Sequence, residues 1–459
     1  MIMNKRNIQK RAHEKGFILV VAMMVIVVML IMAMPFLFKL SAQYRTTEKS
    51  FKSMSAFNLA EAGVERAIYE LNNGYMLLPW TVEPDGTLKT SMLNFPAADG
   101  KVIGDINVDI LPPAGATGDE TRFVESQGQI SFIANRTVDK EVRVLLEAEY
   151  GSIFKFAVFA DEGIYMASNV RVDSYNTKEN LIYDEKTSGN MGHVGSNTTV
   201  TPAAGGGIYL SSQDELMGRV ASGYGTAPKS IDNVIDTNTA NTYVDGGKFI
   251  LGSPFNMTPD PPISNFTDSL DFNPANPGIL AKSKGGPVVL NETNSGIYDS
   301  FIMDVGSTVK IQGNVTLYVT GVTQSKGEFL MKNNTTLEIE PGSSLKLILG
   351  DTSFQQLSNT EVNNLTKTAE NLVILGTEQF TGEMHWNSNT ALYGAIFVPE
   401  AAIHYDSNHD LYGSLICNWL DFNSNANVHY DEALGNLDWI SGGLPTYVVK
   451  SWQQVGAGV

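Results

Sequence analysis

The sequence predicts an α+β protein in which a long N-terminal membrane helix precedes a small antiparallel sheet and then a mainly-β domain, a parallel β-solenoid. Three observations predict this order. An apolar run extends from Phe17 to Phe38, short alternating segments occupy residues 100–150, and a degenerate repeat with a fixed asparagine occurs beyond Tyr150. Alternation with a period of two indicates strands, and an uninterrupted apolar run of this length indicates a membrane helix.

The apolar run is long enough to cross a membrane. A helix formed by it would span about 30 Å of hydrocarbon, the thickness of a bilayer core. The leader before it, residues 1–16, is rich in Lys and Arg and holds a single acidic residue, Glu14. The positive-inside rule therefore keeps the leader in the cytoplasm and sends the rest of the chain across the membrane.

The helix is expected to continue outside the membrane, so that it covers residues 17–73. Between Ser41 and Leu71 the chain holds no proline, and apolar residues recur at the spacing of one helical face. The following Asn72-Asn73-Gly74 matches a C-terminal cap. Pro35 removes one backbone donor within the membrane run and is expected to kink the helix there.

Two segments carry a resemblance to a known family. The boundary at Gly16 and Phe17 resembles the leader of type IV prepilins (class III), and residues 56–67, with Ala60-Glu61-Ala62-Gly63, resemble the end of the first helix of PilX-type minor pilins. The resemblance implies that a prepilin peptidase cuts after Gly16, that the helix stays on the mature protein, and that Phe17 becomes a methylated N-terminus. A plain signal-anchor helix is the alternative.

The same resemblance implies where the protein resides and what it contacts. It would be a single-pass protein of the inner membrane, with a periplasmic or extracellular C-terminal domain, and would then move to a filament tip or a pseudopilus. Expected partners are other pilins or pseudopilins, the prepilin peptidase and the inner membrane, with a large tip adhesin as a further candidate.

Val21 departs from the pattern of major pilins. Those families carry a Glu at the fifth mature position, where it pairs with the terminal amine of a neighbouring subunit, and in this chain that position is Val21. A carboxylate in lipid needs a partner, and this run offers none. A subunit at a filament tip has less need of the Glu, which fits a minor subunit.

Composition limits the exported part. The net charge of −18 makes nucleic acid an improbable partner. The single cysteine, Cys417, excludes an intrachain disulfide. Stability must therefore come from burial and backbone pairing, and the chain beyond the helix is long enough for two domains.

The first of these domains is expected at residues 74–150. Alternation in 106–110, 130–132 and 142–146 is interrupted by turn residues, which indicates three or four antiparallel strands between about 100 and 150. The apolar face of the long helix needs such a sheet as its packing partner.

The second domain is expected at residues 151–435, with an insertion at about 198–285 and a C-terminal tail at 436–459. A repeat of alternating apolar residues followed by asparagine recurs about every 20 residues, as one coil of a parallel β-solenoid requires. An antiparallel β protein is the alternative. The region, notably 192–197 and 428–434, also resembles the β-solenoid-like domain that follows PilX-type N-termini. The repeat predicts an internal asparagine ladder formed by Asn389, Asn408 and Asn425.

The repeat also aligns one group of potential metal ligands. His385, His404 and Asp421 occupy equivalent positions in the three tandem copies, and such residues could bind a transition metal. Apolar residues flank each of them, so alternation points the three side chains outward. We therefore expect a solvated ladder rather than a metal site, and no cofactor.

The sequence contains neither a Gly-x-Ser-x-Gly motif nor a phosphate loop, and no catalytic residue is assigned. We expect no enzymatic activity. The favoured interpretation is a minor pilin or pseudopilin that initiates, caps or assembles a type IV filament or a secretion pseudopilus. The alternatives are a tip adhesin for glycans or surfaces and, third, a β-solenoid polysaccharide lyase or hydrolase.

Overall fold

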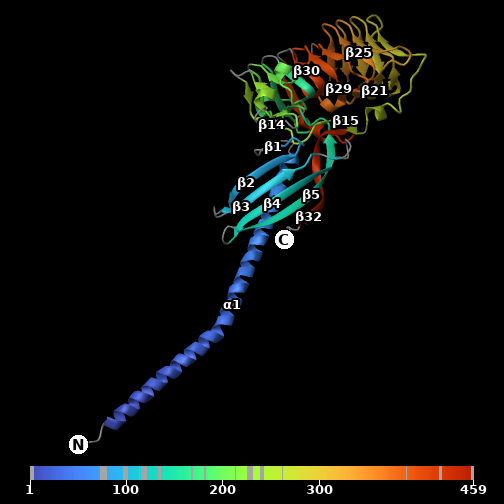
Figure 1. Cartoon of the computed structure of the whole chain (residues 1–459). Helices are drawn as coiled ribbons and strands as arrows, with labels where there is room; N and C mark the ends of the chain where they lie inside the picture. Colours follow the sequence, from blue (N-terminus) through green and yellow to red (C-terminus); the bar gives the residue numbers. More distant parts are fainter. Residues whose placement is uncertain are drawn as a thin grey trace.

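The structure is a computed structural model that describes residues 5–72, 80–96, 102–112, 114, 121–132, 136–166, 169–179, 182–211, 213–224, 231–237, 242–260, 262–388, 390–422 and 426–455. Side chains at 5–17, 96, 102–103 and 132 lie outside this description. The described chain has one long N-terminal helix, an antiparallel sheet beside the end of that helix, and a larger domain of parallel strands (Figure 1).

Helix α1 covers Lys5–Asn72 and ends at the residue where the sequence predicts a cap. It begins within the leader rather than at Phe17, because residues 5–15 hold neither proline nor glycine. The N-terminal part protrudes from the domains and is bent (Figure 1). Pro35 lies inside the helix, and a proline is the ordinary cause of a sharp bend.

The antiparallel sheet has the strand order β1-β2-β3-β4-β5-β32-β15 among the described residues. Consecutive strands β1 to β5 form a meander, and β3, β4 and β5 bury alternate side chains toward α1. The strands are β1 Thr81–Val82, β2 Leu88–Pro96, β3 Val102–Ile110, β4 Thr121–Phe132, β5 Arg136–Ser152, β32 Ser441–Val455 and β15 Asn256–Asp260.

Two strands of this sheet come from parts of the chain that the sequence analysis placed elsewhere. Residues 436–459 were expected to be a tail, but β32 within them pairs antiparallel with β5 over nearly its whole length. β15, from the expected insertion, then pairs with the start of β32. The run Tyr447-Val448-Val449 has the β-branched and aromatic side chains that suit a strand.

The larger domain is built from parallel strands, and we call it the parallel-strand domain. Its main sheet has 21 strands within the described residues. They are β6 Val158–Met166, β7 Arg171–Tyr175, β8 Val194–Ser196, β9 Gly207–Leu210, β10 Glu215–Leu216, β11 Val220–Ser222, β12 Ile235–Thr237, β13 Tyr243–Val244, β14 Lys248–Ile250, β16 Gly278–Ala281, β18 Gly296–Tyr298, β19 Ser300–Met303, β21 Asn314–Val319, β22 Gly327–Met331, β24 Ser344–Leu349, β25 Thr352–Gln356, β27 Leu372–Gly376, β28 Glu383–Trp386, β29 Leu392–Tyr405, β30 Leu411–Phe422 and β31 Val428–Asp431.

A second parallel sheet in this domain contains β17 Val288–Leu290, β20 Thr308–Ile311, β23 Thr336–Ile339 and β26 Glu361–Asn364. A short helix and several 3-10 turns connect the strands. These are α2 Ile231–Val234, η2 Glu185–Thr187, η3 Pro202–Ala204, η5 Ile263–Phe266, η6 Glu292–Asn294, η7 Ala369–Asn371 and η8 Glu432–Asn436.

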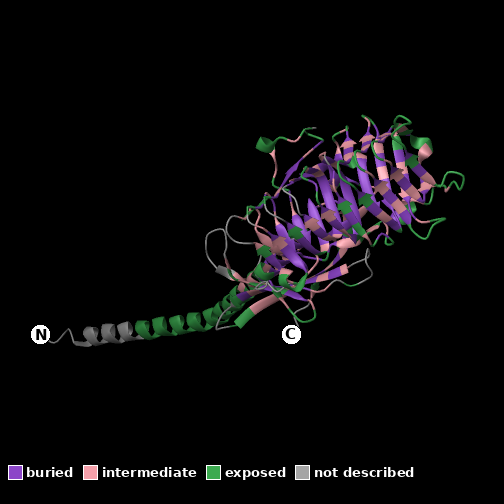
Figure 2. Cartoon of the chain, turned by 90° about the horizontal axis from the view of Figure 1, so that it is seen from above, coloured by how far each residue is buried: buried purple, intermediate pink, exposed green. Residues whose placement is uncertain are grey.

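Identical side chains stack inside the parallel-strand domain, because parallel strands in register place equivalent residues above one another. Phe301, Phe329 and Phe354 form a stack with ring centroids 4.9 and 4.7 Å apart, and Trp386 continues it at 6.2 Å. Figure 2 shows this buried interior and, in contrast, the exposed protruding helix.

The first and last strands of this domain are neighbours. β6 pairs on one side with β30 and on the other with β8 and β9, so the beginning of the domain lies in its middle. The residues expected to form an insertion contribute β9 to β14, which extend the parallel pairing beyond β6. Two connections to the antiparallel sheet, β5 to β6 and β31 to β32, leave from this central position, and β15 makes a further excursion to that sheet between β14 and β16.

Candidate functional site

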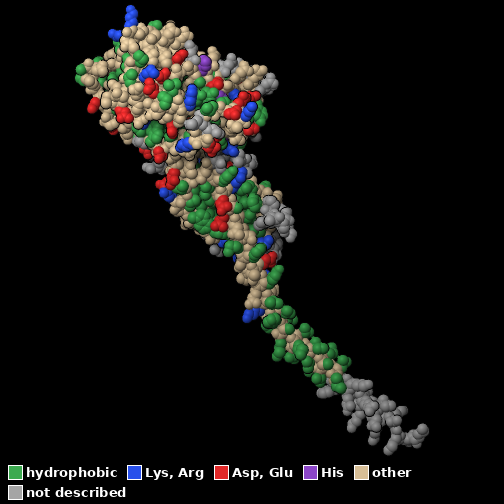
Figure 3. All heavy atoms as spheres, turned by 180° about the vertical axis from the view of Figure 1, so that it is seen from behind, with side chains coloured by type: hydrophobic (Ala, Val, Ile, Leu, Met, Phe, Trp, Pro, Cys, Tyr) green, Lys and Arg blue, Asp and Glu red, His purple; other side chains and the backbone are tan. Residues whose placement is uncertain are grey.

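The protruding part of α1 presents an apolar surface. Large hydrophobic side chains from Ile18 to Leu40 are exposed, from 42% at Val21 to 74% at Met32. The mean hydropathy of its most apolar window is 3.0, which is high enough for a membrane span by length and composition. Figure 3 shows hydrophobic side chains covering this part of the helix. An apolar surface of this extent is stable only against lipid or against other apolar helices.

The C-terminal part of α1 packs on the antiparallel sheet. Ala56, Leu59, Ala60, Val64 and Ala67 are buried there with the inward residues of β3, β4 and β5. Small residues on one helical face let the helix approach the sheet closely. This contact positions the protruding part relative to both domains.

Glycines make the close approach possible. A Cβ atom at Gly63 would lie 2.2 Å from Ser126 Oγ and 2.7 Å from Ile106 Cγ2. A Cβ atom at Gly128, on the facing strand β4, would lie 2.0 Å from the carbonyl oxygen of Ala56. The segment Ala60-Glu61-Ala62-Gly63 therefore has a packing role here: Ala60 and Gly63 face the sheet, whereas Glu61 and Ala62 are half-buried at its margin.

The end of α1 is tied to the sheet by polar side chains. Glu70 is buried; it accepts a hydrogen bond from Trp80 Nε1 at 2.6 Å and pairs with Arg66 Nε at 2.7 Å. Asn72 Nδ2 donates to the carbonyl oxygen of Tyr447 at 3.0 Å, and its Oδ1 accepts from the backbone N–H of the same residue. The end of the helix is therefore joined to β32, which the sequence analysis did not anticipate.

Arg122 joins the antiparallel sheet to the parallel-strand domain. It is buried, and its Nη1 donates to the carbonyl oxygen of Gly252 at 3.0 Å. Its guanidinium group also lies over the rings of Tyr224 and Tyr447, 4.9 and 5.4 Å from their centroids. A planar cation suits both contacts at once.

The expected processing site lies in α1. Gly16 and Phe17 are helical, and the side chain of Phe17 lies outside the described part of the structure. Val21 is on the exposed apolar part of the helix.

The expected asparagine ladder is not internal at its one described position. Asn408 is exposed, and Asn389 and Asn425 lie outside the described residues. The buried polar residue of this repeat is the preceding serine, since Ser407 Oγ donates to the carbonyl oxygen of Ser388 at 2.7 Å. Both residues lie in the turn that follows β29, where Ser407 points inward and its neighbour outward.

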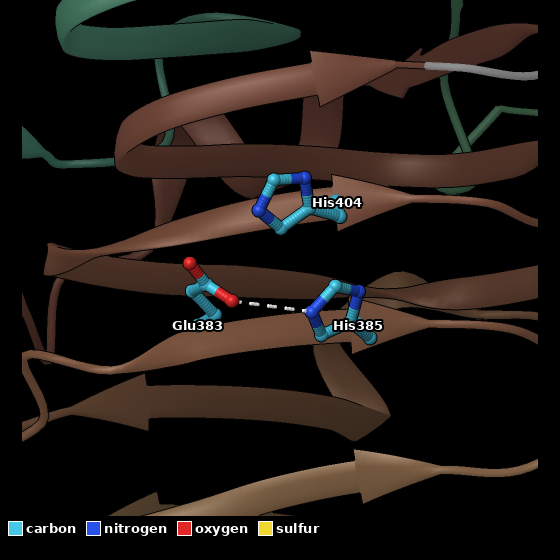
Figure 4. A group of neighbouring side chains, drawn as sticks. All are labelled: Glu383, His385 and His404. Atoms are coloured by element: carbon cyan, nitrogen blue, oxygen red, sulfur yellow. Dashed lines mark hydrogen bonds and ion pairs between the residues drawn. The ribbon is translucent and has the colours of Figure 1, made fainter.

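The three aligned potential metal ligands occupy one outward row. His385 of β28 pairs with His404 of β29, which pairs with Asp421 of β30. The two imidazole rings stack with centroids 4.7 Å apart and an interplanar angle of 12°. Glu383, two residues before His385, joins them, as Figure 4 shows, and the sequence analysis did not name it.

A second histidine cluster is buried where the first and last parallel strands meet. His429 Nδ1 lies 2.6 Å from Asp173 Oδ1, and its Nε2 lies 3.5 Å from Asp410 Oδ2. Asp173 also accepts from Tyr183 and Arg171. Burial by itself would lower the pKa of His429, but its hydrogen bonds to the two aspartates and their charges outweigh burial and raise it.

A pocket of about 730 Å³ lies at the junction of the two domains. Its lining includes Lys155, His193, Arg219, Asp245 and Glu432. Burial, followed by the charge of Arg219, lowers the pKa of His193 to about 4, so this imidazole is neutral at pH 7. Basic and acidic groups occur together here, as the lyase or hydrolase alternative would require.

Several of these contacts lacked a sequence signal. Asn72 and Arg122 gain their partners from residues far away in the chain, and no local pattern identifies such partners. Glu383 had one signal, its position two residues before His385 on the same face of a strand.

Comparisons with known proteins match part of the chain. A family model described as a domain of unknown function, DUF7305, matches residues 280–437. A search of curated proteins finds no significant match. Among solved structures, the chain is similar to the competence-associated pilin ComZ from Thermus thermophilus, with a TM-score of 0.35 and 13% sequence identity, over 88% of this chain and 97% of that chain.

Proposed function

We propose that this protein is a minor pilin or pseudopilin of the PilX type that helps to initiate, cap or assemble a type IV filament or a related secretion pseudopilus. The observation that carries the proposal is the division of α1 into two parts. Residues 18–40 expose an apolar surface, whereas residues 56–72 are packed on the antiparallel sheet through Ala60 and Gly63. One helix thus combines an anchor with a rigid connection to the exported domains.

This division suits a subunit that leaves the membrane for a filament. Before assembly, the apolar part of α1 is solvated by lipid, and in a filament the same surface packs against the helices of other subunits. Both environments are apolar, so the transfer costs little hydrophobic free energy. The residue Val21 adds no carboxylate to be paired, which favours a position at the filament tip.

We further propose that the parallel-strand domain is a β-solenoid that the helix presents outward. Support comes from the in-register parallel pairs β28–β29 and β29–β30 and from the stacked interior aromatic residues. In this arrangement each turn of the chain contacts mainly its neighbours, and outward side chains form rows along the domain.

The processing of the leader tests the pilin proposal. The mature protein is expected to begin at a methylated Phe17, and Gly16→Arg is expected to block cleavage because a bulky cation would occupy the peptidase site. Intact-mass spectrometry of protein from membranes and sheared filaments measures both. Ala12→Arg is the matched control, since it adds the same charge to the leader but keeps the cleavage boundary. A Met1 terminus on filament-derived wild-type protein would reject the proposal.

A tip adhesin is the second candidate, favoured by one observation. The rings of Tyr165 and Tyr209 stack on the outward face with centroids 4.9 Å apart, and Tyr165 is 41% exposed. Exposed aromatic faces are common platforms for sugars. Glycan-array binding by the wild type that is lost in Tyr165→Ala would support this role, and equal profiles of the two proteins would count against it.

A further inference from the structure

We propose that Glu383, His385 and His404 bind a divalent transition metal of the zinc class on the outward face of the parallel-strand domain. The proposal is independent of the filament role. One oxygen or nitrogen atom from each of the three side chains lies within 4.8 Å of the others.

The backbone register creates the site. Parallel pairing of β28 with β29 places His385 directly beside His404, and Glu383 lies two residues earlier on the same face of β28. His385 Nε2 is 3.3 Å from Glu383 Oε2. Figure 4 shows that each imidazole also turns a nitrogen toward the side on which Glu383 lies. Two imidazole nitrogens and one carboxylate oxygen therefore converge on one region of space.

Carboxylates at the other nitrogen of each ring orient the histidines. His385 Nδ1 lies 3.6 Å from Asp406 Oδ2, and His404 Nδ1 lies 3.4 Å from Asp421 Oδ2. A proton on the Nδ1 that faces a carboxylate would leave the lone pair of Nε2 available to a metal, and protein metal sites commonly use this arrangement. The sequence alone placed Asp421 among the ligands, whereas the geometry makes it a positioning residue for His404.

The charges around the rings favour a cation. Three carboxylates, those of Glu383, Asp406 and Asp421, surround the two stacked rings. Calcium and magnesium prefer oxygen ligands throughout, whereas two imidazoles with one carboxylate are a typical ligand set for Zn²⁺.

The site needs only small side-chain movements to close on a metal. Zinc holds its ligands at about 2.0–2.2 Å, so the donor atoms must move closer together than they are here. The side chains of Glu383 and His385 are 66% and 48% exposed, and they are free to rotate toward the metal. Three protein ligands leave one position open to water or to a donor from another molecule.

Isothermal titration of the full chain in detergent tests the site. Untagged protein is stripped with a chelator, dialysed and titrated with ZnCl₂ at pH 7.5. We expect one zinc ion per chain, loss of this binding in His385→Ala and in His404→Ala, and a 10–100-fold weaker affinity in Asp421→Asn. His409→Ala is the matched control, because His409 is exposed but lies outside the cluster.

The absorption spectrum of bound Co²⁺ provides a second readout that does not depend on the heat of binding. Co²⁺ in the wild type should show the visible absorption of a tetrahedral nitrogen and oxygen site, and Glu383→Gln should change that spectrum. The proposal is overturned if zinc gives no saturable binding, if His385→Ala binds as tightly as the wild type, or if His409→Ala loses binding to the same degree as His385→Ala. Circular dichroism of each variant confirms that it remains folded.

Discussion

His429 Nδ1 lies 2.6 Å from Asp173 Oδ1, although the two residues are 256 positions apart in the chain. The pair joins β31, the last parallel strand, to β7, the second one. Ring stacking of Tyr183 and Tyr412 on His429 closes the cluster, with centroids 3.8 and 4.7 Å from the imidazole. The contact therefore joins an early strand of the parallel-strand domain to its last strand in the chain. It lies close to where β31 is followed by β32 of the antiparallel sheet.

The variant His429→Ala is expected to destabilise the full chain by about 3 kcal/mol. Removing one member of a buried ion pair is costly, and here it leaves Asp173 Oδ1 without its 2.6 Å partner while Arg171 and Tyr183 contact only Oδ2. His409→Ala, at an exposed position nearby in the chain, should change stability by less than about 0.5 kcal/mol. Thermal unfolding in detergent, followed by circular dichroism, compares the two, and equal melting temperatures would contradict the role of the pair.

The same cluster predicts a pH dependence. The pKa of His429 is raised above its unfolded value of about 6.5, so its stabilisation is complete below that pH and is lost as pH rises through the folded pKa. The charged and titratable groups that surround it are Asp173, Asp410, Arg171, Tyr183 and Tyr412. The melting temperature of the wild type should therefore fall toward that of His429→Ala as pH rises above about 6.5 and passes through the raised folded pKa. A constant difference across this range would argue against a charged His429.

Gly63→Leu is expected to cost about 3 kcal/mol, because α1 lies too close to β3 and β4 for any side chain at this position. Leucine is a far better helix former than glycine, so local propensity would predict the opposite sign. Glu65→Leu places the same side chain on the exposed side of the helix and should be nearly neutral. Denaturant unfolding of both variants in detergent measures the difference, and an unchanged midpoint for Gly63→Leu would show that the helix does not pack as described.

Ser407→Ala should be more destabilising than Asn408→Ala. Ser407 Oγ is buried and donates to Ser388 O, and the loss of such a bond costs about 1–3 kcal/mol when it leaves a polar group unsatisfied. Asn408 is exposed, so its replacement should stay within about 0.5 kcal/mol. Melting temperatures of the pair distinguish inward from outward positions, and a larger loss in Asn408→Ala would show that Asn408, and not Ser407, points inward in this turn.

If the protein is the minor pilin or pseudopilin proposed above, it should be present in the filament at low copy number. Val21 cannot supply the carboxylate that would pair with the terminal amine of the next subunit, so continuous incorporation is disfavoured. Immunogold labelling with an antibody against the parallel-strand domain should decorate filament ends. Labelling along the whole length would contradict this, whereas Val21→Glu should increase the amount of the subunit in sheared filaments.

Local patterns explain why much of the molecule could be predicted. The end of α1 at Asn72 and the alignment of His385 with His404 follow from periodicity within short segments. The prediction of an inward Asn408 was wrong because a repeat fixes which positions are equivalent but not which of them face inward, and Asn408 lies in the turn after β29 with its side chain exposed. The serine and asparagine positions of the repeat are adjacent in the chain, but their side chains point in different directions. The burial of Ser407 shows that the serine position is the internal one.

The sequence by itself determined the apolar anchor, the helical face that carries Ala60 and Gly63, and the alternation of the strands, since each depends on residues near one another in the chain. Only the tertiary structure decided that β6 lies between β30 and β9, that β32 and β15 complete the antiparallel sheet, and that Asp406 and Asp421 orient the two histidines. The physical reason is that an alternating strand can pair with many others. Which one it pairs with depends on packing between segments far apart in the chain, and no local pattern records that choice.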